Sequence, residues 1–303
     1  MQKPAQYLHQ SAHFGLRDVA IMRLFIIPTI LLLIVMNVFP LFWSLILSFT
    51  KYSAISGDAS FIGLKNYRYI LNNPTIWKYF VLTAKFVIIS VSAEMIIGFG
   101  IALLLNRDFK LKGLVTTLFL IPMMMSPVIV GLFWKLIFNP NYGIFNSVIS
   151  IFYDVGKTAW LSDSTLAFFA IVIVDVWMWS PYVMLLSLAG LSAIPKHLYE
   201  SAEIDRASAW FKFWKITLPL VAPLLLIAAI FRTMEAFKLF DLVMGLTGGG
   251  PGDTTELISI NLYRMAFSQW KTGQACAFAY IILIMIIAIS NIYIKYLNKA
   301  KGD

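Results

Sequence analysis

The chain has 303 residues, of which 60% are hydrophobic and 13% are charged, and its formal net charge is +9. Its mean hydropathy of +0.80 is far above that of soluble domains, so a soluble enzyme and a soluble nucleic-acid-binding domain are excluded. The single cysteine, Cys276, excludes an intrachain disulfide, and the three histidines lack the spacing of metal ligands. We expect an integral membrane protein.

Apolar runs of about 20 residues or more can cross the hydrocarbon core of a bilayer. Such runs cover residues 24–49, 79–105, 113–137, 165–190, 219–243 and 274–294. The first run is too long for a signal peptide, and no small-residue cleavage site follows it. The predicted fold is an all-α integral membrane protein with six transmembrane helices.

Basic residues are unevenly distributed between the two sides of these spans. Of 24 Lys and Arg residues, 13 lie in the two terminal segments and the loops 106–112 and 191–218, against 7 in the three alternate loops. The positive-inside rule therefore places both termini in the cytoplasm, although the first outer loop is itself basic. We expect a cytoplasmic segment 1–23, a membrane domain 24–294 with a charged cytoplasmic loop at about 195–218, and a cytoplasmic tail 295–303.

Several predicted spans contain proline, which kinks or breaks membrane helices and can help them to line a cavity. An alternative is that these prolines only bend the helices for packing. They are Pro28, Pro40, Pro122, Pro127, Pro181, Pro219 and Pro223.

The cytoplasmic loop contains the segment ESAEIDRASAWFKFWKITLPLVAP, which gathers charge and aromatic residues in an otherwise apolar chain. Pro195 suits a first helical turn, and Ser208 suits the N-cap of a second short helix ending at Leu218–Pro219. This helix–turn–helix is too apolar for free solvent and too charged for lipid. Its small residues and carboxylates suit docking to a partner, whereas its Trp and Phe residues also suit a helix lying on the membrane surface.

The same segment resembles the EAA loop of binding-protein-dependent ABC importer permeases. It matches the family pattern at Glu200, Ala202, Asp205, Ala207, Ile216, Leu218 and Pro219. It departs at Ser201, where the family has Ala, and at Arg206, where the family has a Gly that lets the backbone turn freely. Residues 61–74, 120–146, 189–207 and 246–267 further resemble the carbohydrate-uptake class, of the maltose or glycerol-phosphate permease type.

The resemblance implies a permease subunit that moves a sugar or oligosaccharide into the cytoplasm by alternating access, in a bacterial inner membrane. It implies a second homologous permease, two ATPase subunits that hold ATP and Mg, and an extracytoplasmic solute-binding protein. No catalytic, cofactor or metal site is expected in this chain, because GGGPGDTT lacks the lysine of a phosphate-binding loop. The implied ATPase-coupling residues are Glu200, Ser201, Ala202, Glu203, Asp205, Arg206 and Ala207.

Ionisable residues inside spans are costly and mark candidate functional sites. They are Lys85, Glu94, Lys135, Asp175, Arg232, Glu235, Lys238 and Asp241. The candidate substrate pathway comprises Arg232, Glu235, Lys238 and Asp175, with Trp177, Trp179 and Tyr182 as stacking surfaces for sugar rings. The alternatives are internal salt bridges for the charged residues and packing for the aromatic ones.

A different function is also considered, namely a gradient-driven secondary transporter or channel that uses Asp175, Glu94 or Glu235. Such a carrier has no use for an EAA-like loop. A membrane-embedded enzyme would need a nucleophile or a metal set, and the sequence offers neither.

Overall fold

The structure is a computed structural model that describes residues 16–152 and 156–301. In these ranges the regular structure is helical, apart from one isolated bridge between Thr50 and Phe61. The α-helices are α1 (Leu16–Leu33), α2 (Phe39–Ser48), α3 (Lys65–Asn72), α4 (Pro74–Leu105), α5 (Lys112–Met124), α6 (Pro127–Ile137), α7 (Ile144–Ile149), α8 (Ser164–Ser192), α9 (Lys196–Ile204), α10 (Ala209–Lys212), α11 (Leu218–Phe237), α12 (Asp241–Leu246), α13 (Ile258–Tyr263) and α14 (Thr272–Lys301).

The predicted all-α membrane fold is confirmed. Five helical segments are long and apolar enough to cross a membrane, namely Arg23–Ser48, Pro74–Leu105, Ser164–Ser192, Ala209–Phe237 and Thr272–Lys299. The predicted third span consists of α5 and α6, which meet at an angle of 97°. The helix α14 continues through most of the predicted tail, whereas residues 1–15 of the predicted N-terminal segment lie outside the described residues.

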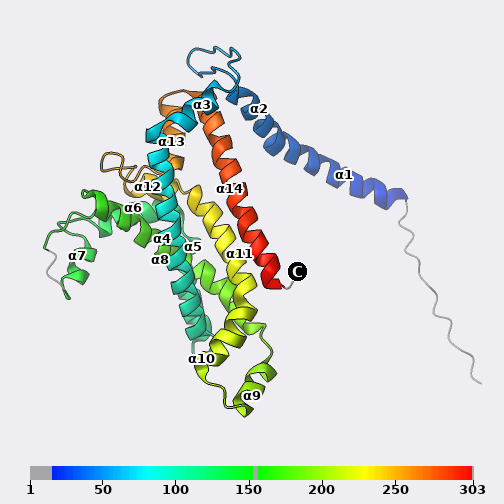
Figure 1. Ribbon diagram of the computed structural model, residues 1–303, viewed down its shortest axis with the longest axis vertical. Helices are drawn as coiled ribbons and strands as arrows, with labels where there is room; N and C mark the ends of the chain where they lie inside the picture. The colour runs from blue at the N-terminus through cyan, green and yellow to red at the C-terminus, as the bar shows by residue number, and fades with distance from the viewer. Residues whose placement is uncertain (1–15, 153–155, 302–303) are drawn as a thin grey trace, which may run out of the picture.

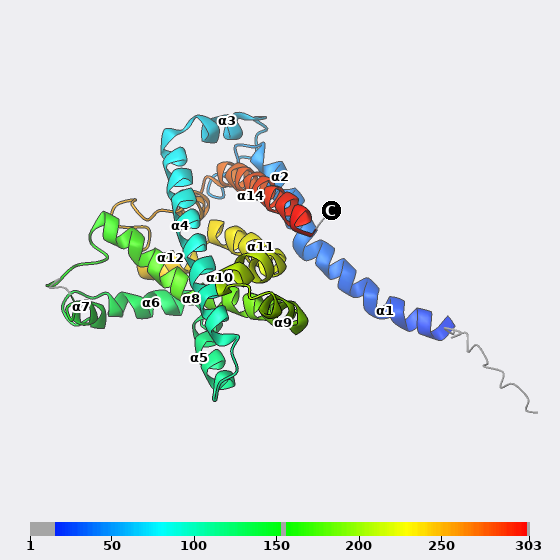
Figure 2. The ribbon, with the colours of Figure 1, turned by 60° about the horizontal axis from the view of Figure 1, so that its bottom comes forward.

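The long helices form a bundle in which α4 packs along α8, and α11 contacts α4, α8 and α14 (Figure 1). The helices α9 and α10 lie at one end of this bundle, and α3 and α13 lie at the other. In both ribbon views α1 extends away from the bundle (Figure 2), and its side chains from Arg23 onward are exposed. Its continuation α2 packs on α14, where the Tyr280 hydroxyl donates to the carbonyl of Leu41.

Gly98 allows the close approach of α4 to α8. A Cβ at this position would lie 2.5 Å from the carbonyl oxygen of Ser180 and 2.7 Å from the Cβ of Val183.

The starts of α4 and α8 are set by local caps. The Asn73 side chain accepts from the N–H of Thr75, and the Asp163 side chain accepts from the first turn of α8.

Prolines break or widen the helices at three places, as the sequence predicted. Between α5 and α6, Ser126 is extended because the following Pro127 disfavours the helical conformation. Before Pro40 and Pro219, the helix instead widens into π-helical turns at Ile34–Val38 and Phe213–Thr217. These wider turns accommodate a ring that would otherwise clash with the preceding turn.

The π-helical turn before Pro219 corrects one predicted boundary. The N–H of Leu218 donates to the carbonyl of Phe213, so the chain stays helical through the proline. The predicted end of the second short helix at Leu218–Pro219 is therefore wrong, because α10 runs on through this turn into α11.

The predicted fifth span, residues 219–243, is also too long at its far end. The helix α11 ends at Phe237, and the carbonyl of Leu239 accepts from the Ser259 hydroxyl rather than from a further helical N–H. Lys238 therefore caps α11, and Asp241 begins α12, which buries Leu242, Val243 and Leu246 in the core. Neither Lys238 nor Asp241 lies within the fifth spanning helix.

Candidate functional site

The charged loop forms the predicted helix, turn and second helix at one end of the bundle (Figure 1). The helix α9 follows Pro195, and Ser208 caps α10 by accepting from the N–H of Phe211 at 3.1 Å. The Tyr199 hydroxyl and the Thr217 hydroxyl lie 2.9 Å apart, which ties α9 to the base of α11. The loop is thus anchored between α8 and α11.

Most of the predicted coupling residues point away from the bundle. The exposed ones are Glu200, Ser201, Glu203, Asp205 and Arg206, whereas Ala202 is buried and Ala207 is half-buried. The Lys212 ammonium lies 3.0 Å from Glu203, so this carboxylate already has a partner within the chain. Glu200 and Asp205 have no ion pair with any described residue and remain available to a partner protein.

Arg206 occupies a left-handed backbone conformation, with φ +54°. Its N–H donates to the carbonyl of Glu203 at 3.0 Å, and the N–H of Ala207 donates to that of Ala202 at 2.8 Å. This pair of bonds is the Schellman motif that commonly ends a helix with glycine. Arg206 therefore adopts the turn for which glycine was expected.

Aromatic side chains surround the start of α10. Trp210 is 72% exposed, and its ring lies 5.5 Å from that of Trp214. Phe213 contacts both tryptophan rings, and its own ring also lies 6.1 Å from that of Phe99 on α4. The exposed tryptophans suit either a protein partner or the membrane surface, so both interpretations of the loop remain.

A buried ionic cluster joins three spanning helices. Arg232 on α11 donates from Nε to Oε2 of Glu94 on α4 at 2.6 Å, and from Nη2 to Oε1 at 2.8 Å. The same Nη2 lies 3.1 Å from Oδ2 of Asp175 on α8, and the guanidinium lies 4.7 Å from the ring centroid of Trp179. Ser90 contacts both carboxyl groups. Glu94, Asp175 and Arg232 are each at most 2% exposed.

The structure brings only some of the predicted pathway residues together. Asp175, Trp179 and Arg232 meet in the buried cluster, which matches the salt-bridge alternative for Arg232. Glu235 pairs with Lys238 at 2.7 Å, and the two side chains are 58% and 55% exposed. Trp177 stacks edge-on against Trp134, and Tyr182 is half-buried. A role of these residues in substrate passage stays a prediction.

The sequence indicated Glu94 only as an ionisable residue within a span and did not identify it as the partner of Arg232. The two residues are 138 positions apart. Ser90 had no distinguishing signal in the sequence, because a serine within a membrane helix commonly bonds to its own backbone.

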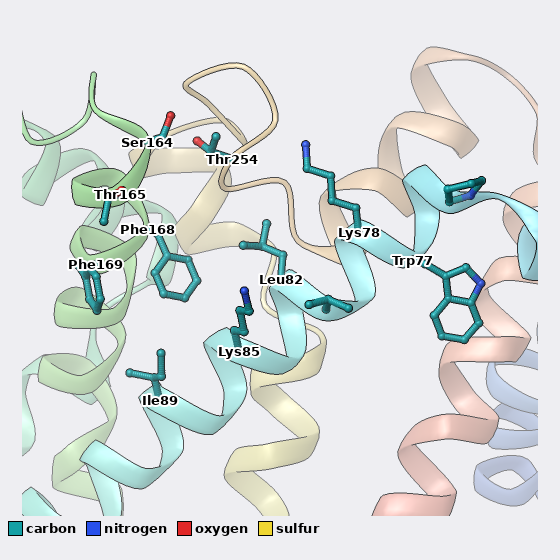
Figure 3. Close-up of a pocket in the computed structure, with 12 residues that line it drawn as sticks. Trp77, Lys78, Leu82, Lys85, Ile89, Ser164, Thr165, Phe168, Phe169 and Thr254 are labelled. Carbon is teal, nitrogen blue, oxygen red and sulfur yellow. The ribbon is translucent and has the colours of Figure 1, made fainter.

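A cleft of about 730 Å³ lies between the N-terminal parts of α4 and α8, and Thr254 also lines it (Figure 3). Its walls are mostly apolar, with Phe168 and Phe169 on α8. Two lysines of α4 line it. Lys78 contacts both carboxylate oxygens of Asp253, at 2.8 and 2.7 Å. Lys85 is exposed and forms no ion pair with any described residue.

Residues 94–302 match the family described as binding-protein-dependent transport system inner membrane component. The chain belongs to this family. This assigns it to a membrane subunit of a binding-protein-dependent transport system, as the EAA-like loop indicated. The family match includes Glu94, Asp175 and Arg232, the α9 loop, and every spanning helix from α5 onward.

Curated relatives cover nearly the whole chain. The trehalose/maltose transport system permease protein MalF of Thermococcus litoralis is 36% identical over 282 residues, which is 92% of this chain and 94% of the relative. The trehalose transport system permease protein SugA of Mycobacterium tuberculosis is 32% identical over 274 residues, which is 90% of this chain and 87% of the relative.

Solved structures show the same fold. A bacterial ABC transporter involved in the import of the acidic polysaccharide alginate has a chain that superposes with a TM-score of 0.81 at 19% identity, covering 93% of this chain and 96% of that chain. A chain of the bacterial alginate ABC transporter in complex with alginate pentasaccharide-bound periplasmic protein superposes with a TM-score of 0.79 at 20% identity. The superposition covers 91% of this chain and 93% of that chain.

Proposed function

We propose that this chain is the transmembrane permease subunit of an ATP-driven importer that moves a sugar or oligosaccharide into the cytoplasm. The observation that carries the proposal is the α9 loop, whose carboxylates are exposed at one end of a bundle that belongs to the importer family. Support for a saccharide comes from the relatives, which are named for trehalose, maltose and starch-product transport.

The proposed complex pairs this chain with a second homologous permease and places two ATPase subunits against the α9 loops. ATP and Mg bind to those ATPases. An extracytoplasmic binding protein delivers the substrate at the opposite end of the bundle. Closure of the ATPases pushes the loops, and the paired membrane domains alternate between inward-facing and outward-facing states.

The basic residues support a cytoplasmic position for both termini and for α9, in an inner membrane.

A gradient-driven carrier is the less supported alternative. It has no use for the α9 loop, and two of the acidic residues it would use, Glu94 and Asp175, are held by Arg232 in the core.

The test is reconstitution of the chain into liposomes with the permease and ATPase that co-purify with it. Binding proteins loaded with trehalose, maltose or alginate oligosaccharide are added in turn, and ATP hydrolysis and sugar uptake are measured. We expect one loaded binding protein to stimulate both. Uptake that follows an ion gradient without ATP would overturn the proposal in favour of a secondary transporter.

A further inference from the structure

The buried ionic cluster has more negative groups than positive ones. Glu94 and Asp175 are fully buried, and Arg232 is the one cation that forms an ion pair with either of them among the described residues. If both acids were ionised, the cluster would carry a net charge of −1 inside the membrane domain. An uncompensated buried charge is strongly disfavoured.

The two carboxyl groups are not held equally by the guanidinium. Both oxygens of Glu94 accept from Arg232, in the two-pronged geometry typical of an ionised carboxylate. Asp175 accepts only one bond from Arg232, at Oδ2 and 3.1 Å, and its Oδ1 is buried without a hydrogen-bond partner among the described residues. Glu94 is therefore the natural counter-ion of Arg232, and Asp175 is the excess acid.

The contacts of Ser90 separately indicate that one of the two carboxyl groups holds a proton. The Ser90 oxygen lies 3.2 Å from Oε1 of Glu94 and is also within hydrogen-bond distance of Oδ2 of Asp175. A serine hydroxyl has one hydrogen and can donate to only one of two carboxylates. The other contact needs a hydrogen that comes from a carboxyl group.

We propose that Asp175 binds one proton in this cluster. Its Oδ2–H donates to the Ser90 oxygen, and the Ser90 hydroxyl donates to Oε1 of Glu94. Each of the two Ser90 contacts then has one hydrogen, and the cluster is neutral, because Glu94 balances Arg232. Two carboxyl groups in one dry site share a proton for the same reason. The site goes beyond the proposed function, because its ligand is a proton and not the transported substrate.

Because the cluster is neutral, it can stay buried and connect three helices mechanically. Asp175 lies on α8 and Arg232 lies on α11, the two helices that flank the α9 loop, and Glu94 extends the connection to α4. A neutral cluster holds these three helices together through its hydrogen bonds, so that movement of the loop reaches α4 as well.

The test is infrared spectroscopy of the full-length chain, purified in its transporter complex, in H₂O and D₂O. We expect the carbonyl stretch of a protonated carboxylic acid, shifted by deuterium. The band should disappear in Asp175→Asn, and it should move but persist in Ser90→Ala. Labelling aspartate with ¹³C at the side-chain carboxyl should shift the band, whereas labelling glutamate should not. A band that glutamate labelling shifts, or a spectrum unchanged by Asp175→Asn, would overturn the assignment.

Thermal melting provides an independent readout. Asp175→Asn keeps the size of the side chain and can donate an N–H to Ser90, so its melting temperature should stay within a few degrees of the parent. Arg232→Met leaves two acids without a cation and should melt far lower or fail to assemble. If Asp175→Asn is as damaging as Arg232→Met, the carboxyl group is needed as an anion and the proposal is wrong.

Discussion

The N–H of Ala207 donates to the carbonyl oxygen of Ala202 at 2.8 Å, and this bond closes the turn at the end of α9. It requires Arg206, one residue before Ala207, to adopt a positive φ of 54°. That conformation costs an L-residue about 1 kcal/mol, whereas glycine adopts it freely.

We therefore expect Arg206→Gly to raise the free energy of unfolding by about 1 kcal/mol, as measured by thermal melting in detergent. Arg206→Ala is the matched control, because it removes the side chain and keeps the strain. If the two variants melt at the same temperature, the turn is not strained at Arg206.

Charge reversal at Glu200 tests docking of the α9 loop. Breaking a buried charged contact at an interface costs about 2 to 5 kcal/mol. Glu200→Lys should therefore insert normally but lose co-purification with the ATPase or substrate-stimulated ATP hydrolysis. Asp58→Lys is the control, because Asp58 is exposed in the loop between α2 and α3 at the opposite end. If α9 lies on an anionic leaflet instead, the added lysine is tolerated, with equal ATPase recovery and normal transport.

Gly98→Ala should loosen the contact between α4 and α8. The new methyl group would lie 2.5 Å from the Ser180 carbonyl oxygen, so backbone must move. Overpacking of this kind costs about 1 to 3 kcal/mol. Gly100→Ala on the same helix is the control, because its methyl group would meet nothing within 4 Å. Equal melting temperatures for the two variants would contradict the close approach.

The pair of Lys78 and Asp253 should be insensitive to pH across the neutral range. The hydrogen bond from Lys78 holds the pKa of Asp253 below its usual value, although partial burial opposes this. A lowered pKa means that the stabilising effect is present above the ordinary value of 3.8 and is lost only as the pH falls through the lowered one.

Amide hydrogen exchange of residues 250–256 measures this pair. Asp253→Asn should speed exchange by a similar factor at pH 5 and at pH 8, once the intrinsic pH dependence is removed. Because both side chains are partly exposed, the effect should be small. A protective effect that falls between pH 8 and pH 5 would contradict the lowered pKa.

Glu235 and Lys238 provide a cleaner test of the substrate pathway than Arg232 does. Their exposed ion pair contributes at most about 1 kcal/mol, so Glu235→Ala and Lys238→Ala should assemble normally. If they line the pathway, uptake or substrate preference changes. Parental uptake of the same sugars by both variants would remove them from the pathway. Arg232→Ala cannot decide this question, because breaking a buried pair costs about 3 to 5 kcal/mol.

The sequence by itself determined the features that depend on residues close together in the chain. The length of an apolar run is sufficient to indicate a span, which is why the spans were identified. The cap at Ser208 and the helix after Pro195 were predictable because capping involves atoms within one turn of the chain. The spacing from Glu200 to Pro219 carried the resemblance to the EAA loop, because such a motif is a pattern of residues close together in the chain; its coupling role stays a prediction.

Only the tertiary structure decided which of the prolines break an apolar run and which charges meet. Hydropathy does not distinguish a straight span from the pair α5 and α6, which meet at 97°, because both halves are equally apolar. It also could not place the end of α11 at Phe237, since a serine on α13 satisfies the next free carbonyl. Arg232 meets Glu94 and Asp175 because the packing of α4, α8 and α11 sets the rotation of each helix, and no local pattern encodes that rotation.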